Sequence, residues 1–215
     1  MRLNKASLLQ LTFGLFFQDF DLDSFVDLFV VNGHIEPEIN QVQKDITFAQ
    51  SPQLFLNNRN GQFVDITEQL SSEFREPVVG RGLATADIDN DGDLDLIITV
   101  NSNSPKFLRN DLPRKEANWI KLILKGEAPN LHAVGAKVVV WSGNLKQSKM
   151  VRTGSSYLSQ SYMNELIFGL GELQSADSLE VLWPASGRID KHGPLIAGQS
   201  YVLSEGNDRL LLTKK

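Results

Sequence analysis

One acidic segment reads Asp87-Ile88-Asp89-Asn90-Asp91-Gly92-Asp93-Leu94-Asp95, and the apolar run Leu96-Ile97-Ile98-Thr99-Val100 follows it. Carboxylates stand at positions 1, 3, 5 and 9 of this short loop, and a glycine stands at position 6. Four carboxylates held so close repel one another unless a cation lies among them, and hard oxygen ligands of this kind suit Ca²⁺. The pattern therefore predicts a calcium loop that leads into a β-strand.

The odd spacing of the acidic residues also assigns the ligands, because alternate side chains of an extended loop fall on one side. We expect Asp93 to supply its backbone carbonyl, and side-chain oxygens to come from Asp87, Asp89, Asp91 and Asp95. The loop departs from an EF-hand, since Ile98 occupies position 12, where an EF-hand has a bidentate glutamate, and a strand pattern replaces the second helix. A solvated acidic turn is the alternative, but it would need neither this spacing nor the glycine.

A second copy of the pattern lies earlier in the chain. The same acidic spacing occurs at Asp19, Asp21, Asp23 and Asp27, and the apolar run Leu28-Phe29-Val30-Val31 follows. Each copy then reaches a shared Ser-Pro element, at residues 51–58 and 104–110. Self-similarity over tens of residues predicts a repeat architecture.

The first copy is expected to bind calcium more weakly than the second, or to be structural only. Its predicted ligands are the Phe25 carbonyl and the side chains of Asp19, Asp21, Asp23 and Asp27. Ser24 stands where the second copy has Gly92. A residue other than glycine costs roughly 1–2 kcal/mol at a backbone position with positive φ. Leu22 and Phe25 also make this loop less polar.

The composition of the chain changes near residues 110–117, which are charged and contain a proline, and we place a domain boundary there. Beyond it, alternating apolar residues predict strands with one buried face, as at Ile120, Leu122 and Leu124. Further strands are expected at 134–140, 146–153, 165–168, 179–183 and 200–203, with a helical turn at 171–176. The predicted class is all-β: a partial β-propeller of about two blades over residues 1–112, then a β-sandwich-like domain over residues 118–206.

These segments also resemble known families. The repeats resemble the FG-GAP/VCBS-type blades of calcium-binding β-propellers. The stretches Asn118-Trp119-Ile120, Gly154-Ser155-Ser156-Tyr157-Leu158-Ser159-Gln160, Phe168-Gly169-Leu170-Gly171 and Val181-Leu182-Trp183-Pro184 resemble an ASPIC/UnbV domain. In this order the two resemble the C-terminal part of the cartilage acidic protein family. The resemblance implies a non-catalytic recognition or adhesion module that is extracellular or on the cell surface and binds a protein or polysaccharide ligand.

Two blades cannot close a ring, since propellers typically need roughly 4 to 8 blades. We therefore expect the chain to be the C-terminal part of a longer protein, and its open blade edges to favour self-association. Residues 8–17 could pass for a signal peptide, but Gln10 and Thr12 interrupt the apolar run, so they are assigned to the first blade.

Composition limits the partners. The chain has 215 residues, a formal net charge of −5 and no cysteine. A negative charge concentrated in two loops argues against nucleic acid and anionic membrane surfaces, and no apolar run is long enough for membrane insertion. Weak calcium loops fill at extracellular rather than resting cytosolic calcium, which favours an extracellular or periplasmic location.

Other functions fit the sequence less well. A glycosidase needs two carboxylates in different environments across a cleft, which near-equivalent aspartates in one loop do not provide. The serine-rich segment 154–161 lacks the pattern of a nucleophile elbow, and its hydroxyls are expected to hydrogen-bond a loop at the sandwich surface. The remaining alternatives are a structural cap on a larger propeller and an accessory protein of a biosynthetic pathway, which the UnbV resemblance suggests.

Overall fold

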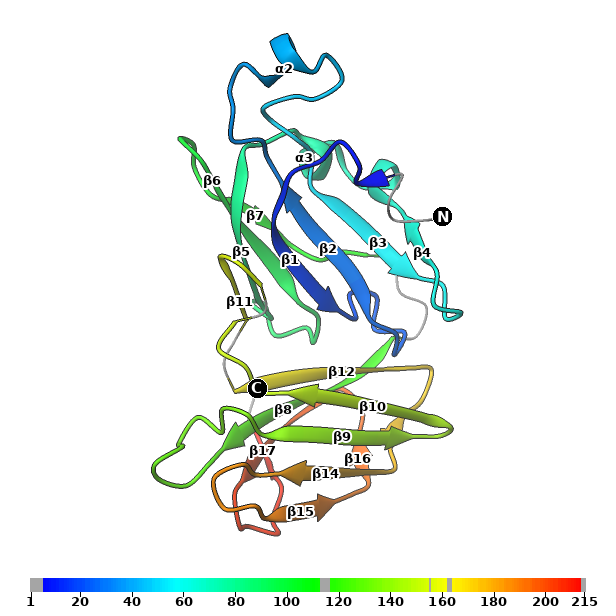
Figure 1. The fold of residues 1–215 in the computed structure, drawn as a ribbon. Coiled ribbons are helices and arrows are strands. Elements are labelled where there is room, and N and C mark those ends of the chain that lie inside the picture. Colours follow the sequence, from blue (N-terminus) through cyan, green and yellow to red (C-terminus); the bar gives the residue numbers. More distant parts are fainter. Residues whose placement is uncertain (1–5, 113–116, 155, 162–163, 214–215) are drawn as a thin grey trace.

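Strands dominate the structure, a computed structural model that describes residues 6–112, 117–154, 156–161 and 164–213. Figure 1 shows two bodies, one built from β1 to β7 together with β11 and the other from the remaining strands, β8 onward. Residues 113–116, where the sequence predicts the domain boundary, lie outside the described residues. None of the helices in the described ranges has the length and hydrophobicity needed to cross a bilayer.

The first sheet, here called blade 1, is an antiparallel meander in the order β1-β2-β3-β4. Its strands are β1 (Thr12–Gln18), β2 (Asp27–Asn32), β3 (Gln53–Asn57) and β4 (Phe63–Asp65). Between β2 and β3 the chain makes an excursion that carries the short helix α2 (Ile39–Val42) at the far end of the molecule (Figure 1). A 3-10 turn, η1 (Thr67–Gln69), and helix α3 (Ser72–Arg75) lead to the next sheet.

The second sheet, blade 2, has the order β11-β5-β6-β7. Three of its strands form a meander, namely β5 (Gly80–Ala86), β6 (Asp95–Val100) and β7 (Lys106–Leu108). The fourth, β11 (Ser159–Ser161), comes from the second half of the chain and pairs with β5 in parallel. Blade 2 is therefore completed by a strand that is distant in the sequence.

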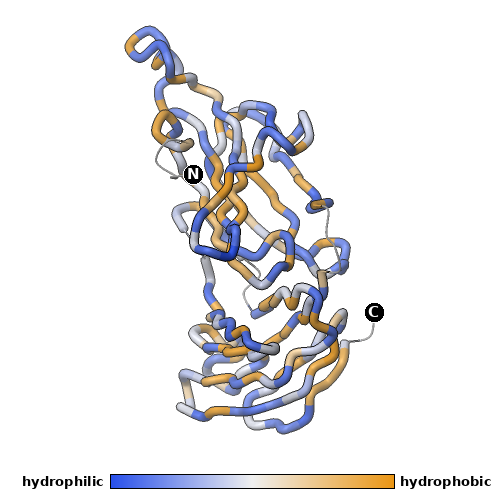
Figure 2. Tube along the Cα trace, turned by 90° about the vertical axis from the view of Figure 1, so that its right-hand side faces the viewer, coloured by the Kyte–Doolittle hydropathy of each residue, from blue (hydrophilic) through white to orange (hydrophobic). Residues whose placement is uncertain are grey.

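The two blades share one hydrophobic core. Phe16, Phe29 and Leu54 of blade 1 pack in a cluster with Leu83 and Ile98 of blade 2, and all five are nearly inaccessible to solvent. The apolar residues of each acidic repeat thus form the contact between blades, as the alternation in a half-buried strand requires. In Figure 2, hydrophobic and hydrophilic residues alternate along the strands of both bodies.

The second body is a β-sandwich of two four-stranded sheets, in the orders β10-β9-β14-β15 and β12-β8-β17-β18, with a small pair β13-β16. Its strands are β8 (Asn118–Lys125), β9 (Lys137–Ser142), β10 (Leu145–Met150), β12 (Glu165–Gly171), β13 (Ser175–Ala176), β14 (Ser178–Leu182), β15 (Ile189–His192), β16 (Leu195–Ile196), β17 (Gln199–Ser204) and β18 (Leu211–Leu212). Both sheets contribute to one core, which includes Ile120, Val140, Phe168, Val181 and Leu203.

The all-β class and the sandwich are confirmed, and two other expectations are wrong. Residues 171–176 form a turn and the strand β13 rather than a helical turn, because Ser175 and Ala176 pair with β16. The described hydroxyls of the serine-rich segment, those of Ser156 and Ser159, accept hydrogen bonds from Leu15 N of blade 1 rather than from a loop of the sandwich. Residues 159–161 add to blade 2 as β11.

Candidate metal loops

Both acidic stretches connect the first two strands of a blade. The segment between β1 and β2 is called loop 19–27, and the segment between β5 and β6 is called loop 87–95. In each case the last aspartate is also the first residue of the following strand, so the loop leads into a β-strand as predicted. Both loops lie at the end of the blades that faces the sandwich (Figure 1).

Loop 87–95 brings three carboxylates together. Asp87, Asp89 and Asp91 each offer an oxygen, and these oxygens lie within 4.8 Å of one another. The loop is shaped by its own amides, since Asp91 N donates to Asp89 Oδ1 over 3.3 Å and Asp93 N donates to Asp91 Oδ1 over 3.1 Å. Asp93, predicted to contribute only its carbonyl, has a buried side chain.

Asp95 is the last aspartate of loop 87–95 and the first residue of β6, and it is here called the closing aspartate, as is Asp27 in loop 19–27. Its Oδ2 accepts a hydrogen bond from Ile88 N over 3.0 Å, and its Oδ1 accepts one from Asn110 N over 3.0 Å. Asp95 is thus held by backbone amides and lies outside the group of three carboxylates, although the sequence predicts it as a ligand.

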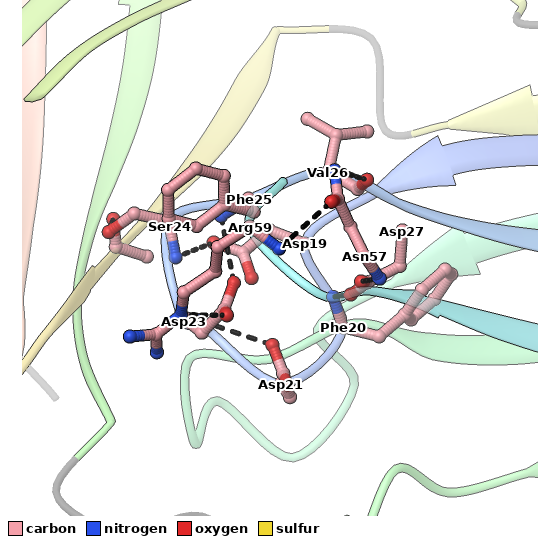
Figure 3. A network of polar contacts seen from close by, with 11 residues as sticks. Asp19, Phe20, Asp21, Asp23, Ser24, Phe25, Val26, Asp27, Asn57 and Arg59 are labelled. Carbon is pink, nitrogen blue, oxygen red and sulfur yellow. Dashed lines mark hydrogen bonds and ion pairs between the residues drawn. The ribbon is translucent and has the colours of Figure 1, made fainter. Parts of the chain in front are cut away.

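Loop 19–27 follows the same plan (Figure 3). Here the three carboxylates that approach within 4.8 Å belong to Asp19, Asp21 and Asp27. Asp27 corresponds to Asp95, and its two oxygens accept hydrogen bonds from Phe20 N over 2.9 Å and from Asn57 N over 2.8 Å. The two loops therefore share their internal hydrogen bonds as well as their acidic spacing.

Asp23 departs from its predicted role. Its Oδ1 accepts a hydrogen bond from Phe25 N over 2.8 Å, and its Oδ2 forms an ion pair with Arg59 Nε at 2.9 Å (Figure 3). Asp23 lies outside the group of three carboxylates in this loop. Phe25, whose carbonyl is predicted as a further ligand, lies two residues after Asp23.

Two positions that sequence reasoning missed are Asn57 and Asn110. Each donates its backbone N–H to the last aspartate of a loop, and Asn110 also donates from Nδ2 to Phe20 O over 2.8 Å, which links the two blades. The signal was available, because these asparagines occupy matching places in the shared Ser-Pro elements.

The backbone has the same unusual shape in both loops. Positive φ angles occur at Asn90 (60°) and Gly92 (95°) in one, and at Leu22 (59°) and Ser24 (79°) in the other. Ser24 therefore adopts the conformation that favours glycine. Its hydroxyl donates to Gly169 O of β12 over 3.0 Å, which offsets part of the strain.

The buried carboxylates of loop 19–27 favour a bound cation. Burial raises the pKa of Asp19 to about 7, with the charge of Lys149 acting in the opposite direction. Burial also raises the pKa of Asp27 to about 8, although two backbone amides donate to it. Asp19 Oδ1 is buried and has no hydrogen-bond partner among the described residues. A divalent cation would favour the ionised carboxylates and supply that missing partner, so the residues present fit a metal ion.

The fold and the loops together define a class of protein in which paired β-blades carry acidic loops and are followed by a β-sandwich. Comparison with known families agrees: residues 19–98 match the FG-GAP-like repeat family, and residues 126–210 match the ASPIC and UnbV family. The chain thus carries an FG-GAP-like repeat followed by an ASPIC/UnbV domain, in the order that the sequence predicts.

No curated protein matches the chain. Among solved structures, one similar chain is a "putative cell adhesion protein" from Bacteroides ovatus, with 13% identity and a TM-score of 0.24 over 96% of this chain and 86% of that one. A similarity this low supports no conclusion about fold or function.

Proposed function

We propose that this protein is a calcium-dependent recognition module with no catalytic role. The observation that supports calcium binding is that both loops cluster three carboxylates, hold their last aspartate by two amides and have two positive φ angles, although Asp27 belongs to its cluster and Asp95 does not. The buried, unpartnered Asp19 Oδ1 supports it independently. Carboxylate oxygens are the ligands that Ca²⁺ prefers.

In loop 87–95 the ion would be held by Asp87, Asp89 and Asp91, and in loop 19–27 by Asp19, Asp21 and Asp27. When bound, calcium would neutralise the clustered carboxylates and hold each turn in one conformation. Hydrogen bonds then hold each loop on its blade. Asp27 accepts from Asn57 N in β3, and Asp95 accepts from Asn110 N shortly after β7. Calcium would therefore stabilise the blades rather than take part in a reaction.

Recognition of a protein or polysaccharide ligand outside the cytoplasm is the role that fits such a module. The FG-GAP-like repeat and the ASPIC/UnbV domain are both present, and carboxylate-only loops of modest affinity fill at the millimolar calcium of extracellular fluids. The excursion that carries α2 and the outer face of the blades offer exposed surface for a ligand.

A second role, that of a structural cap, is favoured by β11. This strand belongs to the ASPIC/UnbV half of the chain but completes blade 2. If capping is the main role, the protein will bind no ligand of its own on a polysaccharide array in millimolar calcium. Binding that disappears with EGTA would support recognition instead.

Replacement of Asp89 by alanine tests calcium binding. Titration of the wild-type protein with calcium chloride in a calorimeter should show two sites, and Asp89→Ala should abolish the site in loop 87–95. Asp45→Ala is the matched control, because Asp45 is an exposed acidic residue outside both loops. Unchanged calcium binding by Asp89→Ala, or no binding by the wild type, would remove the proposal.

A further inference from the structure

Both acidic loops pack directly against the ASPIC/UnbV sandwich. A Cβ atom at Gly92 would lie 1.8 Å from Trp119 of β8, so the turn of loop 87–95 touches that indole ring. On the other side, a Cβ atom at Gly169 of β12 would lie 2.1 Å from Asp19 Oδ2. Gly171 N also donates to Leu22 O over 3.0 Å. The candidate metal loops are therefore also the surface on which the sandwich rests.

A lysine of the sandwich reaches into loop 87–95. Lys121 Nζ lies 2.8 Å from Asp87 Oδ2, 3.4 Å from Asn90 Oδ1 and 3.8 Å from Glu165 Oε2. The pair is buried, with 6% of the Lys121 side chain and 1% of the Asp87 side chain exposed. A buried ion pair of this kind is costly to break from one side, because the remaining charge stays out of water.

The strand pattern of β8 explains why a lysine is found there. Side chains of a strand alternate between faces, and Ile120, Leu122 and Leu124 face the sandwich core. Lys121 therefore faces the blades. Lys149 of β10 is its counterpart at the other loop: it donates to Ile167 O and, over 3.4 Å, to Gln18 Oε1, and its charge acts on Asp19.

We propose that Lys121 shares Asp87 with the metal of loop 87–95, so that calcium binding to this loop is coupled to the contact between blade and sandwich. The inference rests on the calcium function proposed above. A carboxylate has two oxygens, so Asp87 can hold the ammonium with Oδ2 while Oδ1 is free for a cation. The lysine serves as a built-in cation that keeps the junction closed without calcium, and its charge lowers the affinity of the loop for calcium.

Neutral replacements of Lys121 test the coupling. Lys121→Met and Lys121→Gln are made with Asp21→Ala, which disables loop 19–27, so that titration with calcium chloride reports loop 87–95 alone. Each variant should bind calcium about tenfold more tightly, because a repelling charge close to the ion is removed. Lys125→Met is the matched control, since Lys125 is exposed at the end of the same strand, and it should bind calcium like its parent.

Thermal unfolding provides the second measurement. In EGTA, the Lys121 variants should melt below their parent, and calcium should remove most of the difference, because the ion replaces the lost charge. Wild-type affinity in both Lys121 variants, or failure of both to fold even in millimolar calcium, would overturn the coupling. If instead neither the wild-type protein nor the Asp21→Ala parent binds calcium, the proposed calcium function itself is wrong.

Discussion

At the scale of single residues, one backbone conformation distinguishes the two loops. Position 6 of each loop has a positive φ, and it is filled by Gly92 in one and by Ser24 in the other. A glycine is required at position 92 for two reasons. Its φ of 95° favours glycine, and Trp119 occupies the place where a side chain would lie. Ser24 carries a side chain at the equivalent position, and its hydroxyl donates to Gly169 O of β12.

Substitution of Gly92 separates these two requirements. Gly92→Ala should lower the free energy of unfolding by about 3 to 5 kcal/mol, since it combines backbone strain with overpacking against the indole. Gly61→Ala is the control: Gly61 also has a positive φ of 78°, but a Cβ atom there would meet nothing within 4 Å. It should cost only about 1 kcal/mol. Equal losses in urea unfolding would show that Trp119 does not constrain the turn.

The sequence predicts these loops well because the information is local. Acidic spacing and one glycine indicate a metal loop, and the positive φ at Ser24 agrees with the expectation drawn from its alignment with Gly92. Lys121 could not be predicted as a neighbour of Asp87, because the contact depends on how the sandwich packs on the blades. Nor does the spacing show that Asp23 pairs with Arg59.

At the scale of elements, β11 joins the two bodies. Besides the pairing of β11 with β5, Leu15 N of β1 donates to Ser159 Oγ of β11 over 3.3 Å and to Ser156 Oγ, just before β11, over 3.0 Å. The two hydroxyls also bond to each other over 2.9 Å. The serines that invite a nucleophile interpretation therefore hold a strand between the blades.

Removal of these hydroxyls should loosen the contact between β11 and β1. Ser156→Ala and Ser159→Ala each remove one acceptor of the Leu15 N–H and should each cost less than about 1 kcal/mol, whereas the double variant removes both and should cost about 1 to 3 kcal/mol. Hydrogen exchange at the Leu15 amide should accelerate most in the double variant. Exchange that is unchanged in the double variant would mean that the amide does not depend on the serines.

The sheet that β11 joins could not be predicted from the sequence. Alternation identifies the strands β8, β9, β12, β14 and β17 of the sandwich, since each of them buries one face in a single core. It does not say which sheet a three-residue strand joins. Residues 159–161 are polar, and they join blade 2 through backbone pairing with Leu83, Ala84 and Thr85.

At the scale of the whole molecule, the two blades end in open edges. In the part of the chain that the structure describes, the outermost strands are β1 and β4 in blade 1 and β11 and β7 in blade 2. β7 is also apolar on its exposed side, where Phe107 lies opposite Ile97 with 53% and 38% of their surface exposed. An unpaired edge next to an apolar patch favours pairing with another chain.

We therefore expect the protein to self-associate through blade 2. Sedimentation velocity should show a mass that rises with concentration, and Phe107→Lys should shift the protein towards the monomer. Leu131→Lys, at an exposed apolar residue in a loop of the sandwich, should leave the association unchanged. A wild-type protein that sediments as a monomer at all concentrations would contradict this expectation.

The parallel pairing of β11 with β5 has a consequence for synthesis on the ribosome. Since β5 begins at Gly80 and its partner ends at Ser161, the N-terminal blades emerge from the exit tunnel long before their last strand is translated. During that interval the edge of β5 has no native partner and is open to chaperones or to a neighbouring nascent chain. Translation pauses before codon 161 should thus lower the yield of native protein more than pauses after it.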